Sequence, residues 1–84
     1  MPGKDAKVKL YTKDGFCPMC DFTKKWLNDN DIEFNEIKVH PTDEEQLQYL
    51  RDKGWRSFPV VVPLPYDSST AWTGFVINKL KTLL

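Results

Sequence analysis

The chain has 84 residues and a mass of 9.8 kDa, so we expect residues 1–84 to form one small domain. Apolar residues make up 40% of it and charged residues 29%, a proportion that excludes a disordered chain. Twelve basic and twelve acidic side chains balance, which argues against a nucleic-acid binder. No apolar run approaches the length of a membrane span, and residues 1–7 show no secretory signal, so the expected location is cytoplasmic.

Two cysteines, Cys17 and Cys20, lie three residues apart. A disulfide across so short a loop would hardly constrain the unfolded chain, which argues against a structural role. One such pair and a single histidine, His40, do not supply the four ligands of a zinc site. We therefore expect no metal and no organic cofactor, and we interpret the pair as a redox-active dithiol. Two inert thiols remain the alternative.

The segments around the cysteines are predicted to form a strand, a turn and a helix. Residues 6–11 alternate apolar and lysine side chains, which is typical of a half-buried strand. Residues 12–15 form a turn cluster. Residues 21–29 carry apolar side chains at helical spacing that are expected in the core: Phe22, Trp26 and Leu27.

Pro18 favours the first position of that helix, which places Cys17 at the helix N-terminus and Cys20 one turn inside. Unpaired N–H groups and the helix dipole stabilise a thiolate there, so the pKa of Cys17 is expected below the free-thiol value of about 8.5. Lys13 is expected to add positive potential nearby, which Asp14 and Asp21 partly oppose. Cys17 is then the attacking thiol and Cys20, expected to be more buried, is the resolving thiol in an exchange through a mixed disulfide.

Five further elements are predicted, at residues 32–39 (strand), 43–53 (helix), 57–62 (strand), 70–72 (strand) and 74–83 (helix). Asn30 is expected as an αL cap, Thr42 and Glu45 as a capping box, Gly54 as a helix stop and Thr73 as the last cap. The order βαβαββα predicts an α/β domain with a four-stranded mixed sheet and helices on both faces. Its first two strands are expected to be parallel and its last two antiparallel.

This order, with a C-x-x-C at the first helix, resembles the glutaredoxin family of the thioredoxin fold over about residues 8–83. Three segments carry the resemblance, at residues 11–20, 54–62 and 72–80. It implies that the Phe58–Pro59 peptide is cis and faces the C-x-x-C loop. An extended substrate segment could then pair with the backbone of Phe58 as an added strand. Phe58 and Pro59 are therefore candidate substrate-binding residues. Lys13 is a third candidate because of its positive charge near the cysteines.

The segment Trp72-Thr73-Gly74-Phe75 looks like the W-S-G-F of NrdH-type redoxins, and the sequence lacks the Gly-Gly pair with which glutaredoxins hold glutathione. This similarity implies reduction by thioredoxin reductase and electron donation to ribonucleotide reductase. The Cys17-Pro18-Met19-Cys20 loop instead keeps the proline of the glutaredoxin C-P-Y-C, so glutathione is the alternative donor. The segment from Trp72 to Phe75, comprising Trp72, Thr73, Gly74 and Phe75, is a candidate docking surface, with core packing as the alternative for Trp72 and Phe75.

The leading hypothesis is a monomeric thiol–disulfide oxidoreductase without nucleic-acid or membrane partners. A binding module of another class is the alternative, in which the cysteines are vestigial or ligate an iron–sulfur cluster between two chains. His40 is a candidate general base, and a residue of the helix-entry loop otherwise. Arg56 is either solvated or in contact with an anionic substrate group, glutathione included.

Overall fold

The computed structural model describes residues 6–84; residues 1–5, part of the segment in which no secretory signal is expected, lie outside the described part. The main elements are β1 (Val8–Lys13), α1 (Pro18–Asp29), β2 (Phe34–Val39), α2 (Glu44–Asp52), β3 (Val60–Pro63), β4 (Trp72–Thr73) and α3 (Ile77–Leu80). Two 3₁₀ turns are added at Ser68–Thr70 and Lys81–Leu83. The predicted order βαβαββα is confirmed. Within residues 6–84, no helix has the length and apolar character that a membrane crossing requires.

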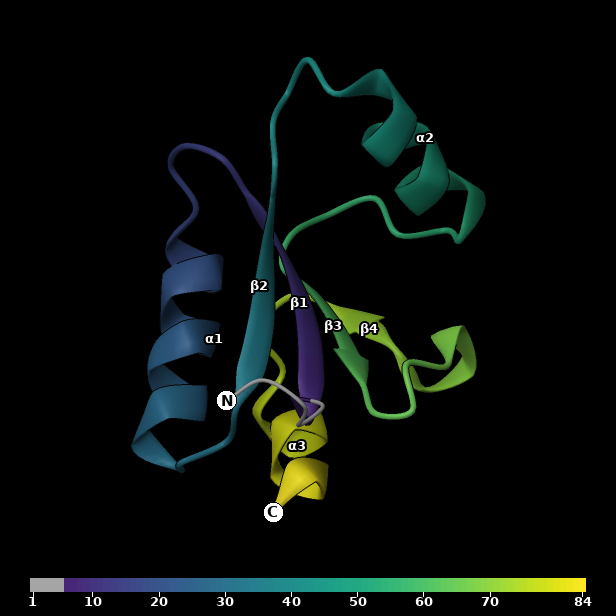
Figure 1. Cartoon of the computed structure of the whole chain (residues 1–84). Coiled ribbons are helices and arrows are strands. Elements are labelled where there is room, and N and C mark those ends of the chain that lie inside the picture. Colours follow the sequence, from purple (N-terminus) through teal and green to yellow (C-terminus); the bar gives the residue numbers. More distant parts are fainter. Residues whose placement is uncertain (1–5) are drawn as a thin grey trace.

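The four strands form one mixed sheet in the order β2-β1-β3-β4. The strands β1 and β2 run parallel, from Val8 opposite Phe34 to Lys13 opposite Val39. The strand β3 is antiparallel to both β1 and β4, as the short connection between β3 and β4 predicts. Figure 1 shows α1 and α3 packed on one face of the sheet and α2 on the other.

Strand alternation gives each face of the sheet its own hydrophobic core, because successive side chains point to opposite faces. The first core lies under α1 and α3 and includes Val8, Leu10, Leu27, Val61 and Leu80. The second lies under α2 and includes Tyr11, Val39, Leu50, Val60 and Val62. Burial in the second core, with Tyr49 beside it, raises the pKa of Tyr11.

Two of the predicted helix ends are wrong by one residue. Asn30 is not left-handed, with φ at −105°; the residue in the αL region is Asp31, with φ at 55°. The helix α2 is capped by Asp43, whose carboxylate accepts from the Gln46 N–H, and not by Thr42. Thr42 is unavailable because its hydroxyl bonds Nδ1 of His40. Glu45, which was expected to complete a capping box with Thr42, therefore forms none.

The C-terminal helix also differs from the prediction, because it begins at Ile77 rather than at residue 74. Its N-cap is Val76, without a side-chain cap bond, so Thr73 does not cap it. Thr73 instead belongs to β4, opposite Val60. Gly74 then takes a left-handed φ of 87° and donates its N–H to the Pro59 carbonyl, which delays the helix.

The end of β1 and the start of β3 also differ from the prediction. Thr12 and Lys13, predicted in a turn, continue β1 because β2 offers them partners at Lys38 and Val39. The third strand begins at Val60 rather than at residue 57. Gly54 has a left-handed φ of 84° just beyond α2, as its predicted role as a helix stop requires.

Candidate redox site

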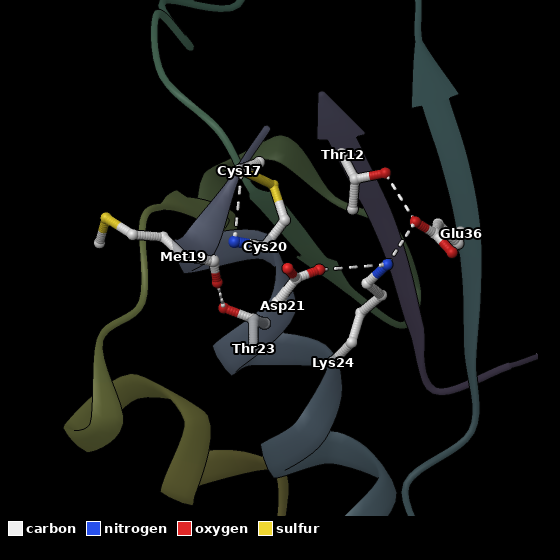
Figure 2. A network of polar contacts seen from close by, with 8 residues as sticks. All are labelled: Thr12, Cys17, Met19, Cys20, Asp21, Thr23, Lys24 and Glu36. Carbon is white, nitrogen blue, oxygen red and sulfur yellow. Dashed lines mark hydrogen bonds and ion pairs between the residues drawn. A yellow bond between two sulfur atoms is a disulfide. The ribbon is translucent and has the colours of Figure 1, made fainter. Parts of the chain in front are cut away.

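Cys17 and Cys20 form a disulfide at the N-terminus of α1, with 5.3 Å between their Cα atoms (Figure 2). Pro18 is the first residue of the helix, as predicted, because its fixed φ and missing N–H suit that position. Cys20 is only 2% exposed, whereas Cys17 is partly exposed. Of the two cysteines, Cys17 is thus the one that a partner can reach.

Cys17 is also the N-cap of α1. Its Sγ atom accepts a hydrogen bond from the Cys20 N–H at 3.3 Å, and its carbonyl accepts from the Asp21 N–H at 3.2 Å. The first N–H groups of a helix have no partner within the helix and carry the positive end of its dipole. Once the disulfide is reduced, the same donors favour a thiolate at Cys17.

A polar network lies one helical turn beyond the disulfide, between α1 and the sheet (Figure 2). The Thr12 hydroxyl donates to Glu36 Oε2 at 2.8 Å, and Lys24 Nζ donates to the same oxygen at 3.1 Å. Asp21 Oδ1 lies 3.8 Å from Lys24 Nζ. The network ties α1 to both β1 and β2.

Burial of Glu36 opposes its charge and acts to raise its pKa. The hydrogen bonds from Thr12 and Lys24, with the positive charges of Lys24 and Lys38, outweigh burial, and the pKa of Glu36 is lowered. Sequence reasoning missed this network because Thr12 and Glu36 are 24 positions apart. The available signal was a lysine four residues after Cys20, which places it on the same helix face.

The proline segment lies beside this loop. The Phe58–Pro59 peptide is cis, as the resemblance implied. The Pro59 carbonyl accepts from the Gly74 N–H at 2.8 Å, and a Cβ atom built on Gly74 would stand 3.7 Å from Cε of Met19. The three segments that carry the resemblance therefore meet at one edge of the sheet.

Apolar side chains flank the disulfide: Phe16 precedes Cys17 in the chain, Met19 lies between the two cysteines, and Phe22 follows Cys20 and packs against Phe75. Phe16 is 86% exposed, Phe22 58% and Met19 44%. The prediction that Phe22 lies in the core is wrong, because its helix position faces Phe75 on the surface, with 6.0 Å between ring centroids. Phe75 is partly buried and packs against the first core. We call these four residues the redox-site apolar surface.

Trp72 takes the core alternative, since it is 8% exposed and belongs to the first core. Its indole Nε1 has no hydrogen-bond partner among the described residues. Trp26 also packs against that core and is partly buried. A docking role for Trp72 stays a prediction; the exposed apolar side chains near the disulfide are those of Phe16, Met19 and Phe22.

Comparison with known proteins identifies this architecture. The Glutaredoxin family model matches residues 8–63. The chain belongs to the glutaredoxin family. The glutaredoxin-like protein NrdH of Lactococcus lactis subsp. cremoris (strain MG1363) is 32% identical over 79 residues, which are 90% of this chain and 97% of that protein. The NrdH protein of Lactococcus lactis subsp. lactis (strain IL1403) is 30% identical over the same shares.

Solved structures show the same fold. The crystal structure of the thioredoxin-like protein BC3987 has a TM-score of 0.71 and 31% identity, over 93% of this chain and 100% of that chain. The glutaredoxin of Archaeoglobus fulgidus shares the fold at a TM-score of 0.69 and 24% identity, over 93% and 85% of the two chains. This member of the glutaredoxin family is thus an NrdH-like redox protein with a thioredoxin-like fold.

The other predicted site residues lie at the same edge of the sheet. Lys13 is exposed and ends β1. His40 Nε2 lies 3.9 Å from Asp14 Oδ2, and its Nδ1 bonds the Thr42 hydroxyl at 2.7 Å. These contacts place His40 in the loop that enters α2, which is the structural alternative for it. Arg56 is exposed in the segment that leads to Phe58.

Proposed function

We propose that this glutaredoxin-family protein is a dithiol electron carrier that reduces protein disulfides. The observation that carries the proposal is the position of Cys17, which is partly exposed and caps α1, next to a buried Cys20. A nucleophile that is stabilised as a thiolate and accessible to a partner is what disulfide exchange requires.

In the proposed reaction the Cys17 thiolate attacks one sulfur of the partner disulfide, forms a mixed disulfide and releases the first partner thiolate. Cys20 then loses its proton to solvent and attacks the Cys17 sulfur. The Cys17–Cys20 bond forms and the second partner thiolate leaves, so two electrons pass to the partner. Phe58 and Pro59 would hold the partner segment, with Lys13 supplying positive potential. The reaction needs no metal or organic cofactor.

Two observations support a flavoprotein reductase, thioredoxin reductase, as the electron donor. The Trp72–Phe75 segment follows the NrdH pattern, and the redox-site apolar surface offers exposed rings for docking. Similarity to the NrdH proteins supports ribonucleotide reductase as the acceptor. Glutathione is the second candidate donor, favoured by the proline of the Cys17–Cys20 loop. We further propose that the carrier acts as a monomer in the cytoplasm.

The test is NADPH oxidation with a model protein disulfide in the presence of either donor system. We expect fast turnover with thioredoxin reductase and slow turnover with glutathione and glutathione reductase. Cys17→Ser abolishes turnover, and Cys20→Ser traps a mixed disulfide that appears on a non-reducing gel. Fast turnover with glutathione alone would reverse the choice of donor. Undiminished turnover of Cys20→Ser without an adduct would refute the dithiol mechanism.

A further inference from the structure

Both arginines of the sequence, Arg51 and Arg56, line one small hollow next to the proline segment; every other basic residue is a lysine. The hollow has a volume of about 210 Å³. Its remaining walls are apolar and come from the second core and its rim: Leu47, Leu50, Trp55 and Phe58. Its lining thus combines four apolar or aromatic residues with two arginines.

The hollow lies beside the redox site, on the α2 face of the sheet. Phe58 is a wall of the hollow and precedes the cis Pro59. The Pro59 carbonyl accepts a hydrogen bond from the Gly74 N–H. A Cβ atom built on Gly74 would in turn lie 3.7 Å from Cε of Met19, in the redox loop. Figure 1 shows the segment from α2 returning to β3 near the end of β1, where that loop begins. A chain bound at Cys17 that continues past Phe58 therefore reaches the hollow.

Both guanidinium groups are available to a ligand. Arg51 and Arg56 are exposed, and neither forms an ion pair within residues 6–84. The neighbouring carboxylate of Asp52 accepts instead from Gln48 Nε2 at 2.8 Å. Arginine presents a planar set of donors that matches a carboxylate in a bidentate manner, which lysine does not.

We propose that this hollow, together with Arg51 and Arg56, binds an acidic segment of the partner polypeptide next to its reactive disulfide. An apolar partner side chain would enter the hollow between Leu47 and Phe58, and carboxylates flanking it would meet the two arginines. The proposal rests on the proposed function and adds the chemical class of its acceptor. Charge complementarity selects the occupant, because Arg51 and Arg56 form no ion pair with any carboxylate among residues 6–84.

The experiment uses the full-length protein, reduced beforehand, and two quenched fluorescent peptides with one internal disulfide each. Both carry a leucine beside a cysteine; glutamates flank it in one peptide and glutamines in the other. The measurement is the second-order rate constant of reduction. Each exposed charge pair contributes about threefold, so the wild type is expected to reduce the glutamate peptide about tenfold faster. Raising the salt concentration reduces this preference.

The variant Arg51→Gln/Arg56→Gln is expected to lose the preference and to keep the wild-type rate on the glutamine peptide, which also verifies its folding. The variant Arg51→Lys/Arg56→Lys is expected to keep part of it, since charge remains but bidentate geometry is lost. The matched control is Lys79→Gln/Lys81→Gln, which removes the same charge near the C-terminus and retains the full preference.

Three results would overturn the acidic partner: equal wild-type rates on both peptides, a preference that survives in Arg51→Gln/Arg56→Gln, or an equal loss in the lysine control. Glutathione disulfide, used as a third substrate, separates the other source of carboxylates. If its rate falls in Arg51→Gln/Arg56→Gln by the same factor as that of the glutamate peptide, the hollow serves glutathione. A wild type that reduces neither peptide overturns the proposed function itself.

Discussion

The Sγ atom of Cys17 accepts a hydrogen bond from the backbone N–H of Cys20 at 3.3 Å, so the accessible sulfur is also the cap of α1. The second cysteine therefore contributes to the first in two ways. Its sulfur forms the disulfide, and its backbone donor remains to stabilise a thiolate after reduction.

The first prediction concerns the ionisation of the reduced thiols. In Cys20→Ser the remaining Cys17 is expected to form a thiolate at least about one pH unit below the remaining Cys20 in Cys17→Ser. The measurement is the thiolate absorbance, or the rate of alkylation, as a function of pH. In concentrated urea the two variants should behave alike, because the helix is lost. Equal titration of both folded variants would contradict a helix-cap effect.

The second prediction concerns the redox-site apolar surface. Phe22→Ser removes a ring that is 58% exposed and lies outside the buried core, so the free energy of unfolding should change little. Loss of an aromatic contact at an interface raises KM for the flavoprotein reductase by about tenfold, with little change in kcat. The matched control is Tyr49→Ser on α2, which is 46% exposed on the opposite face of the sheet. An equal rise in KM for both variants would argue against docking at Phe22.

The third prediction concerns stability at low pH. The pKa of Glu36 is lowered, so its contribution to stability is present above its unfolded pKa and disappears as the pH falls through its folded pKa. Thr12→Val removes one donor and should cost about 1 kcal/mol at about pH 7, and much less at about pH 3. Urea unfolding at both values measures this. Thr70→Val, at an exposed hydroxyl outside the network, is the control. A cost for Thr12→Val that does not depend on pH would contradict the role given to Glu36.

The fourth prediction concerns the unpartnered indole of Trp72. Trp72→Phe removes a buried donor that bonds nothing among the described residues, which offsets the smaller volume of the phenyl ring. We expect the free energy of unfolding to stay within about 1 kcal/mol of the wild type, whereas Trp72→Ala should cost about 3–5 kcal/mol. Urea denaturation of the three proteins compares them. A loss in Trp72→Phe as large as in Trp72→Ala would show that the donor is satisfied in solution.

The order of elements and the pairing of strands could be predicted from the sequence because they follow from hydrophobic periodicity and connection length. Helix ends were harder, since several residues at each end can act as a cap. Thr42 and Asp43 both suit the N-cap, and only the hydrogen bond between His40 and Thr42 leaves Asp43 free for it. Thr12 and Lys13 read locally as a turn, yet β2 supplies them with ladder partners.

In the redox site, too, features that depend on local sequence were predictable and features that depend on tertiary contacts were not. The positions of Cys17 and Cys20 depend on a local signal, Pro18 at the start of a helix, and were predictable. Phe22 was wrongly assigned to the core because helical spacing does not show which apolar side chains of α1 face the sheet. Phe22 instead packs against Phe75 at the surface. The Thr12–Glu36–Lys24 network depends on strand register, which no local pattern specifies.

The central sheet separates two layers that are filled independently, one under α1 and α3 and one under α2. The sulfur chemistry is located in the first layer, and the arginine-lined hollow in the second. Substitutions around the hollow can therefore retune partner choice while the thiol environment stays constant. Under the proposed function, such a division would let the same dithiol act on new partners after changes to a few surface side chains on α2 and the segment that follows it.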